Sequence, residues 1–395
     1  MIRKLSQDVS AIEPSVIEWR RHFHQYPDLS FQETETSDFI AEKLLSFGQI
    51  LVTRPTPTSV MGVIRGARPG RIIALRADID ALPIEEISDL PFTSTRKGVM
   101  HACGHDGHAA ILLGAAQILS QLTDELDGEV RLLFQHAEEV PPGGAIEMVR
   151  AGVMTGVDEV FGLHLSSAYE SCTFGLRSGP LTAATDRFDI TIKGKGGHSA
   201  FPEGAIDPVV IGSHVVVALQ SIVSRQTAAI DTVVLSACQL SAGQAYNIIP
   251  ETMEITGSTR TFKPELRQAL PGNIERIVQG VTQGFGAEYD FKYSHGYASV
   301  INDEGLINRI EGVLTDTFGP GSYSFIEPVM PGEDFSAFQA DCPGAFVELG
   351  TRDPEKGTDQ PHHNPKYRMD EAALAYGVEF FVALVRDRLT GEGAE

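Results

Sequence analysis

Three histidines, one cysteine and one aspartate fall within the eight residues from His101 to His108. Imidazole nitrogens and thiolate sulfur are the ligands that borderline-soft divalent metals prefer. Cys103 and His105 are two residues apart and precede an expected helix, so both side chains can reach one ion. The segment indicates a metal site, although a polar helix cap with a chance group of histidines would give the same pattern.

Two adjacent acids, Glu138 and Glu139, follow the largely apolar residues 130–135. Neighbouring side chains at a strand end point in different directions, so one carboxylate can bind a metal while the other stays free as a general base. A pair of solvated surface charges is the alternative. The loop Pro141–Gly144 that follows favours a functional role for the pair.

Further candidates stand alone in their segments. His164 has apolar neighbours on both sides, which is also typical of a core histidine. His362 and His363 form a pair in an expected loop. Asp78 and Asp80 follow an apolar strand, where each can orient a metal ligand or cap a helix.

The elements around these residues alternate between strand and helix. Short apolar runs predict strands at 71–75, 130–135 and 159–165, and an Ala- and Leu-rich stretch predicts a helix at 107–119. This alternation is typical of an α/β domain with a mostly parallel sheet flanked by helices. Ligands bind outside the carboxyl ends of such strands, where we expect the paired acids and His164 to lie.

The pattern changes after about residue 182, where apolar and polar residues alternate as in a half-exposed strand. The order of the following segments is β-α-β-β-α-β, which matches a ferredoxin-like unit of the α+β class. We expect Pro271 to break the second of its helices. The predicted elements after the first strand are a helix at 207–225, strands at 231–240 and 251–262, a helix at 265–284 and a strand at 288–293. Residues 184–293 are therefore predicted to form a satellite domain inserted into a catalytic domain of residues 1–183 and 294–395.

Composition narrows the classes of protein. The 395 residues carry a net charge of −22, which argues against nonspecific binding to nucleic acid or to an anionic membrane. Four cysteines are too few for a disulfide scaffold, so reduced thiols and a cytoplasmic location are expected. No apolar run approaches 18 residues, so no transmembrane helix is predicted.

Taken in order, these motifs resemble the M20 metallopeptidase and amidohydrolase family, in particular the branch of aminoacylases, hippurate hydrolases and indole-acetyl amino acid hydrolases. The resemblance extends over about residues 20–371. The matching stretches are LRADIDALP at 75–83, MHACGHDGH at 100–108, FQHAEE at 134–139, GLHL at 162–165, GKGGHS at 194–199, NIIP at 247–250, GSTRTF at 257–262, GEDF at 332–335 and HNP at 363–365.

The resemblance implies a site for two divalent metal ions, with zinc, manganese, cobalt and nickel all compatible with the ligand types. The implied ligands are Cys103, His105, Glu139, His164 and His363. His363 is preferred to its neighbour because it directly precedes Asn364-Pro365. Glu138 is implied as the general base, and Asp80 as the aspartate beside the ligands.

The implied reaction is hydrolysis of the amide bond of N-acyl-L-amino acids by a metal-bridged hydroxide. His198 would reach a neighbouring subunit's active site in a homodimer and steady the oxyanion, while Asn247 and Arg260 would bind the substrate carboxylate. An aminopeptidase or dipeptidase is the alternative within the family, but those relatives carry His and Asp where this chain has Arg76 and Cys103. A catalytically silent relative that binds conjugates is the alternative from another class.

One departure from the family pattern is His136, which stands where the family has proline before Ala-Glu-Glu. It is interpreted as an extra metal ligand, a donor to a ligand, or a tolerated loop variant.

Overall fold

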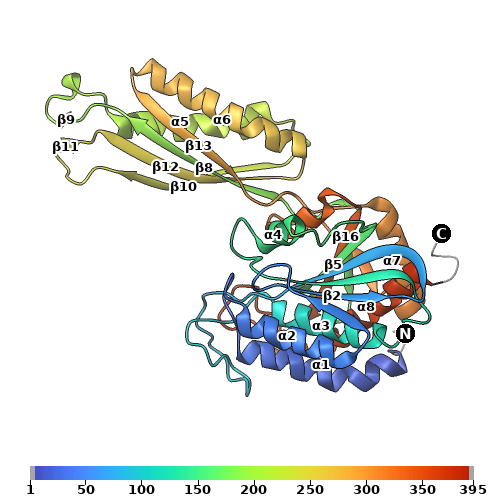
Figure 1. The fold of residues 1–395 in the computed structure, drawn as a ribbon. Helices are drawn as coiled ribbons and strands as arrows, with labels where there is room; N and C mark the ends of the chain where they lie inside the picture. Colours follow the sequence, from blue (N-terminus) through green and yellow to red (C-terminus); the bar gives the residue numbers. More distant parts are fainter. Residues whose placement is uncertain (1–4, 391–395) are drawn as a thin grey trace. The chain divides into compact units, whose positions relative to one another are not determined.

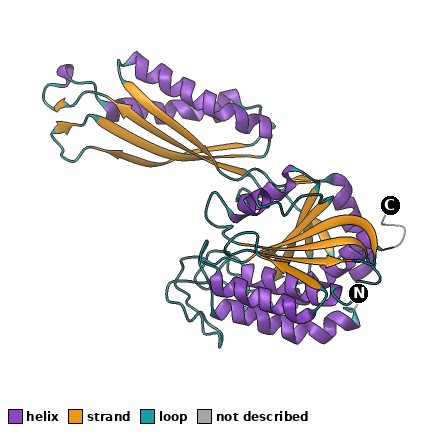
Figure 2. Ribbon diagram, viewed as in Figure 1, coloured by secondary structure: helices purple, strands orange, loops and turns teal. Residues whose placement is uncertain are grey.

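The computed structural model describes residues 5–390, which form two compact units (Figures 1 and 2). The first unit comprises the residues up to Leu181, Ile301–Glu327 and the residues from Asp334 onward. The second comprises Thr182–Val300 and Pro328–Glu333. The predicted insert of residues 184–293 lies within the second unit, and its last strand, β13 (Glu288–His295), continues two residues beyond the predicted end.

The first unit is built on an eight-stranded sheet in the order β1-β2-β4-β3-β5-β16-β6-β15. The central strands β4, β3, β5 and β16 are parallel, and antiparallel pairs flank them on both sides. The predicted α/β fold is confirmed, with a sheet that is mixed at its margins. The strands are β1 (Ile50–Thr53), β2 (Val60–Arg65), β3 (Arg68–Asp78), β4 (Asp127–Gln135), β5 (Glu159–Glu170), β6 (Phe174–Leu176), β15 (Tyr323–Phe325) and β16 (Gly344–Arg352), beside a short pair of β7 (Gly179–Pro180) with β14 (Ile301–Asn302).

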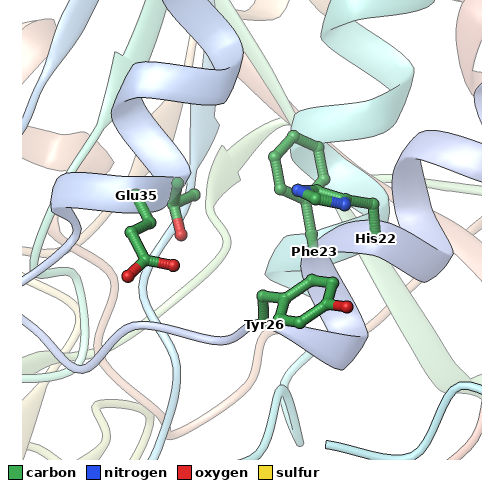
Figure 3. Close-up of a pocket in the computed structure, with 5 residues that line it drawn as sticks. His22, Phe23, Tyr26 and Glu35 are labelled. Atoms are coloured by element: carbon green, nitrogen blue, oxygen red, sulfur yellow. The ribbon is translucent and has the colours of Figure 1, made fainter. Parts of the chain in front are cut away.

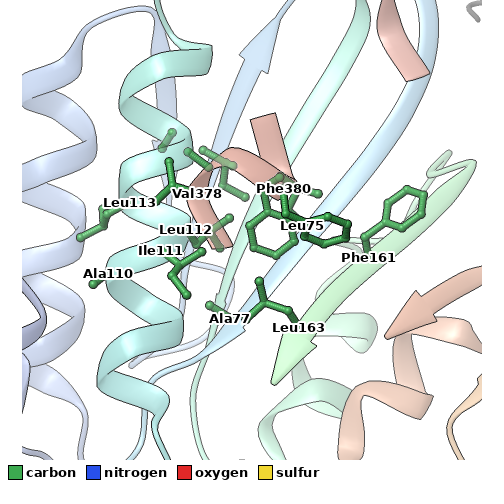
Figure 4. Packing of buried hydrophobic residues seen from close by; sticks show 14 of the residues in the cluster. Leu75, Ala77, Ala110, Ile111, Leu112, Leu113, Phe161, Leu163, Val378 and Phe380 are labelled. Atoms are coloured by element: carbon green, nitrogen blue, oxygen red, sulfur yellow. The ribbon is translucent and has the colours of Figure 1, made fainter. Parts of the chain in front are cut away.

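Helices cover the sheet because its central strands are apolar on both faces. Figure 1 shows α1, α2 and α3 on one side of the sheet and α4 on the other. Figure 4 shows the core between α3, α8 and the central strands, with Leu112, Leu75 and Phe380 among its members. The helices of this unit are α1 (Gln7–Gln25), α2 (Thr34–Phe47), α3 (His105–Leu119), α4 (Gly144–Arg150), α7 (Glu304–Phe318) and α8 (Ala372–Leu389).

Two glycines let α3 pack closely in this core. A Cβ atom on Gly107 would lie 2.4 Å from Leu165 Cδ1, and one on Gly114 would lie 2.7 Å from Val378 Cγ2. Gly107 therefore sets how near the first turn of α3 comes to strand β5.

The second unit has a four-stranded antiparallel sheet in the order β10-β12-β8-β13, with helices α5 and α6 packed on it. Its chain order, β8-α5-β10-β12-α6-β13, matches the predicted ferredoxin-like order. Its elements are β8 (Ala184–Lys193), α5 (Pro208–Ser221) continued by a π-helical turn (Ile222–Gln226), β10 (Val233–Ala242), β12 (Thr252–Thr261), α6 (Pro264–Gly284) and β13, with a small pair of β9 (Gly197–His198) and β11 (Ile248–Ile249).

The expected break of the second helix at Pro271 is wrong, because α6 runs unbroken from Pro264 to Gly284. Proline removes one backbone hydrogen bond from a helix interior. The buried face of α6 continues on both sides of Pro271, through Leu270 and Ile274, so packing against the sheet holds the helix together.

One helix among the described residues, Pro208–Gln226, is long and apolar enough to cross a membrane by length and composition alone. Of its most apolar window, 33% is buried within the structure. The part that packs inward, including Ile211, Val215 and Leu219, belongs to the core of the second unit.

Candidate metal centre

The loop before α3 supplies the first metal-ligand candidates. Gly104 precedes the helix with a left-handed backbone (φ 96°), a conformation that glycine adopts without strain. His105 is the first residue of α3, and its side chain is fully buried. The loop therefore delivers Cys103 and His105 to the same end of the central strands.

Two groups of three donor residues share Cys103. One consists of Cys103, His105 and Glu139, and the other of Cys103, His164 and His362. Within each group the donor atoms lie within 4.8 Å of one another. Cys103 Sγ lies 3.6 Å from His164 Nε2 and 3.9 Å from His362 Nδ1. A sulfur common to two donor groups suits a pair of divalent ions held side by side.

The predicted ligand His363 lies outside both groups, and the structure brings its neighbour His362 to Cys103 and His164 instead. The backbone turns at His363 (φ 61°), and His363 Nε2 lies 3.1 Å from Glu139 Oε1. That contact raises the pKa of His363, whereas burial, reinforced by the charges of other histidines, lowers the pKa of His362 to about 3. Each ring thus reaches a donor residue, His362 through Cys103 and His363 through Glu139.

Asp80 connects two of the donor residues. Its Oδ1 lies 3.2 Å from His105 Nδ1, and its Oδ2 accepts a hydrogen bond of 3.1 Å from the Glu139 amide. Burial acts to raise the pKa of Asp80, but the hydrogen bonds from His105, Ser30 and the Glu139 amide outweigh it and lower the pKa. Asp80 is therefore a buried carboxylate in contact with both ligand candidates, and its role in orienting them stays a prediction.

His108 is engaged in structural hydrogen bonds through both ring nitrogens. Nδ1 lies 2.6 Å from Asp78 Oδ1, and Nε2 accepts a bond of 2.8 Å from the Leu165 amide. This pairing fixes the backbone next to His164. The expectation that His164 ends its strand is wrong, since β5 continues to Glu170.

Glu138 follows β4 in a loop and is 7% exposed. Its carboxylate lies within 4.8 Å of that of Asp334. Asp334 in turn accepts hydrogen bonds from Arg76 and Gln135. The predicted base thus sits in a buried polar region beside the donor groups.

A buried nitrogen without a hydrogen-bond partner also indicates that the donor residues fit a metal ion. His105 Nε2 is buried and makes no hydrogen bond, although Asp78 Oδ2 lies 3.5 Å away. A buried ring nitrogen without a hydrogen-bond partner is costly unless another group occupies its lone pair. A metal ion between Cys103, His105 and Glu139 would fill that role.

Two positions that differ from the family pattern have structural partners. His136 Nε2 lies 3.0 Å from Glu147 Oε2 and its Nδ1 lies 3.4 Å from Thr56 Oγ1, so it is not an extra metal ligand in this structure. Arg76, fully buried, donates to Asp78 at 2.9 Å and to Asp334 at 3.0 Å. Arg76 is therefore a buried cation within a network of carboxylates.

The remaining predicted residues belong to the second unit. His198 is exposed on β9, opposite Ile248 of β11. Asn247 precedes β11, and its carbonyl oxygen accepts a hydrogen bond from the Ser199 amide, which brings the His198 and Asn247 segments together. Arg260 lies on β12, opposite Thr185 of β8. Their roles toward a substrate stay predictions.

A surface hollow between α1 and α2 is distinct from the donor groups. It has a volume of about 370 Å³ and is lined by His22, Phe23, Tyr26, Glu35 and Thr36 (Figure 3). Arg96 lies 2.8 Å from Glu35. The hollow shares no lining residue with the metal centre.

Two residues that lie at the site are not singled out by the sequence. The Asn364-Pro365 motif favours His363, and the residue types carry no signal for the turn that brings His362 to Cys103. Glu33, whose carboxylate accepts a hydrogen bond of 2.8 Å from the Ala137 amide, lies 104 positions away from it in the chain. The residue types around Glu33 carry no local signal for this contact.

Comparisons with known proteins agree with this geometry. The model of peptidase family M20/M25/M40 matches residues 74–387. An N-acyl-L-amino acid amidohydrolase of Geobacillus stearothermophilus is 54% identical over 298 residues, which cover 75% of this chain and 80% of the relative. A thermostable carboxypeptidase 1 of Saccharolobus solfataricus is 41% identical over 380 residues, covering 95% and 96%.

A solved structure is also similar over most of its length. The YXEP protein of Bacillus subtilis, described as a dinuclear metal binding peptidase, has a TM-score of 0.84 and 36% identity, covering 95% of this chain and 98% of that one. These matches confirm the predicted family and its hydrolase class. The chain belongs to peptidase family M20/M25/M40.

Proposed function

We propose that this protein is a metal-dependent amidohydrolase that cleaves the amide bond of N-acyl-L-amino acids. The observation that carries the proposal is the Cys103 sulfur common to two donor groups, with Glu138 buried beside them. The 54% identity to an N-acyl-L-amino acid amidohydrolase supports the same substrate class. All the chemical groups that such a reaction needs are present in the sequence.

Divalent ions bound by Cys103, His105, Glu139, His164 and His362 would lower the pKa of a water molecule and polarise the scissile carbonyl group. Glu138 takes the proton of the attacking water and passes it to the leaving amine. Asp80 keeps His105 and Glu139 oriented through its two carboxylate oxygens. Zinc, manganese, cobalt and nickel all suit a donor set of sulfur, imidazole and carboxylate.

Recognition of the substrate is assigned to the second unit. Arg260 and Asn247 offer a guanidinium and an amide to the free carboxylate of the amino-acid half. His198 is exposed and can donate to the developing oxyanion in an active site of a second copy. These three roles rest on the motifs that contain the residues.

A second candidate activity is the removal of C-terminal amino acids from peptides, which the 41% identity to a thermostable carboxypeptidase favours. Both substrates present an amide bond next to a free carboxylate. The discriminating measurement is the ratio of kcat/KM for N-acetyl-L-methionine to that for an unblocked dipeptide ending in methionine. A ratio above one supports the amidohydrolase, and a ratio below one supports the peptidase.

The assignment of the base is tested with Glu138→Gln, which keeps the side chain's size but cannot take up a proton. We expect kcat to fall by at least about 100-fold, in line with loss of general base catalysis, while bound metal stays constant. Glu129→Gln, at the opposite end of β4, is the matched control and should keep wild-type kcat. Equal rates for Glu138→Gln and Glu129→Gln would show that Glu138 is not the base.

The fifth metal ligand is tested by comparing His362→Ala with His363→Ala. The geometry predicts that His362→Ala loses close to one metal ion per chain and that His363→Ala keeps both. Metal content after gel filtration measures this. The opposite result would restore His363, the residue that the Asn364-Pro365 motif favours.

We also propose that the second unit pairs two copies of the chain. Helix α5 exposes Val209, Val210 and Val217 on the face opposite its core residues, and Val217 is 73% exposed. An apolar helix face of this kind is typical of a subunit interface. Light scattering should show a dimer for the wild type and a monomer for Val217→Asp, whereas Ile230→Asp, a control in an exposed loop, should stay dimeric.

We further propose that the enzyme works in the cytoplasm. Its four cysteines are all free, and reduced thiols are stable there. Fractionation of cells that express the chain with a reporter tag would place it with cytoplasmic or with other markers.

A further inference from the structure

The loop between α1 and α2 reaches the segment that carries Glu138. Leu29 forms a bridge with Ala81, and the Ala81 amide donates to the Asp28 carbonyl oxygen at 2.8 Å. The loop is therefore fixed next to Asp80, at the end of β3. From there Ser30 contacts Asp80, and Glu33 contacts Ala137.

Glu33 joins this loop to the base segment, residues 137–139. Its side chain is fully buried, and Oε1 accepts hydrogen bonds from the Phe31 amide at 2.9 Å and from the Ala137 amide at 2.8 Å. Ala137 directly precedes Glu138. One carboxylate oxygen thus holds the loop and the base segment together.

Asp80 makes the equivalent link on the other side of Glu138. Its Oδ2 accepts from Ser30 Oγ at 2.7 Å and from the Glu139 amide at 3.1 Å. The amides immediately before and after Glu138 are therefore both bound by buried carboxylates. Each carboxylate also binds the 28–33 loop.

The backbone between these anchors needs such support. Ala137 has φ 47°, in the left-handed region that residues other than glycine, asparagine and aspartate seldom adopt. Its carbonyl oxygen accepts from the Gly144 amide at 3.0 Å. The Ala137 conformation sets the direction in which the Glu138 side chain leaves the backbone.

We propose that Glu33 is a positioning residue for the reaction: by binding the Ala137 amide it holds the Ala137 backbone in its left-handed conformation and so aims Glu138 at the reacting water. The inference rests on the proposed function, in which Glu138 is the base. It assigns a role to a residue outside the metal-ligand motifs.

The role does not depend on the charge of Glu33. Burial, with the nearby charge of Asp80, raises the pKa of Glu33 to about 7, despite the hydrogen bonds that favour its ionised form. A protonated carboxyl group still accepts through its carbonyl oxygen, and so does the amide of glutamine. Loss of the acceptor, rather than loss of the charge, should disturb Glu138.

The experiment compares Glu33→Met, which removes the acceptor at similar volume, with Glu33→Gln, which keeps it. For Glu33→Met we expect kcat on N-acetyl-L-methionine to fall about 10- to 100-fold, with KM within twofold and bound metal unchanged. Glu33→Gln should restore kcat to within about threefold of the wild type. Glu35→Met, at an exposed position of α2, is the matched control and should leave kcat unchanged.

Hydrogen exchange of the Ala137 amide gives a readout that needs no substrate. It should be at least about tenfold faster in Glu33→Met than in Glu33→Gln, because only the first lacks an acceptor. Unchanged exchange in Glu33→Met would overturn the proposal, and so would faster exchange with wild-type kcat. If the wild type cleaves no N-acyl amino acid, the proposed function fails, and the exchange rates alone decide whether Glu33 holds Ala137.

If Glu33→Met does not fold, Ala137→Gly provides a second route. Glycine adopts the left-handed conformation without strain, so Glu33→Met is then combined with Ala137→Gly, where folding needs less support from the acceptor. Ala137→Gly alone keeps the Glu33 contact and should keep kcat, whereas the double variant has no group that holds residue 137 in place and should lose kcat at least about threefold. Equal kcat in the double variant and in Ala137→Gly would overturn the proposal.

Discussion

The close approach of α3 to β5 at Gly107 should be necessary for metal binding, and Gly107→Ala tests this. The new Cβ would lie 2.4 Å from Leu165 Cδ1 and 3.0 Å from Met369 Sδ. Carbon atoms in good contact are about 3.5–4.0 Å apart, so this contact must open by about 1 Å, and in a closely packed core we expect helix and strand to separate. Leu165 is fully buried and cannot move aside freely. The separation moves His105, on the helix, away from His164, on the strand.

Two effects follow from that separation. Overpacking of this kind costs about 1–3 kcal/mol of the free energy of unfolding. A displacement of about 1 Å in a reacting site can reduce the rate on the order of 100-fold. We therefore expect Gly107→Ala to lower the melting temperature by several degrees and to reduce both metal affinity and kcat by at least about tenfold.

Gly114→Ala is the matched control, because its Cβ would meet Val378 Cγ2 at 2.7 Å, two turns further along the same helix. It should lose similar stability but keep metal affinity and kcat near the wild-type values. Chelator competition, steady-state kinetics and thermal unfolding of both variants are the measurements. An equal loss of metal affinity in both variants, or none in Gly107→Ala, would refute the link between helix packing and the metal centre.

Three further predictions concern stability. Because burial raises the pKa of Glu33 to about 7 from its ordinary 4.5, the metal-free wild type should lose about 3 kcal/mol of unfolding free energy as the pH rises from 4.5 through 7. Glu33→Gln should lose less, and the same urea midpoint for the wild type at pH 5 and pH 8 would contradict this prediction. His108→Ala leaves Asp78 Oδ1 and the Leu165 amide without their hydrogen-bond partner. It should lower the free energy of unfolding by about 2–5 kcal/mol, measured by urea unfolding. A loss below about 1 kcal/mol would show that other groups replace the ring. Removing metal with a chelator should abolish hydrolysis and lower the melting temperature, because an ion at 100 times its Kd adds about 2.7 kcal/mol to the free energy of unfolding. Added metal should reverse both effects. An unchanged melting temperature would argue against tight binding of metal to the folded state.

Much of the first unit can be predicted because its signals are local. The apolar run before Asp78 and the spacing of Cys103 and His105 lie within single segments, and each corresponds to an element of the structure. The strand before Glu138 is visible in the same way. Local patterns suffice where one element positions one side chain.

Other features depend on contacts between distant parts of the chain. The approach of His362, rather than His363, to Cys103 depends on one backbone turn, which neither residue type dictates. The continuity of α6 across Pro271 depends on a sheet that covers both halves of the helix. The link from Glu33 to Ala137 exists only after the loop before α2 has packed beside the segment that follows β4. In each case tertiary structure outweighs the local preference of the residue.

The order of the strands in the first unit has a consequence for synthesis of the chain. Strand β16 pairs with β5 in the sheet, yet it follows β5 by roughly 170 residues, which include the whole second unit. At translation rates of about 5–20 residues per second, the edge of β5 that later pairs with β16 stays unpaired for roughly ten to thirty seconds. During that time the nascent chain exposes an apolar strand edge of the kind that aggregates or recruits chaperones. The position of the second unit within the chain should therefore make the yield of folded protein depend on how quickly the ribosome completes the roughly 170 residues between β5 and β16.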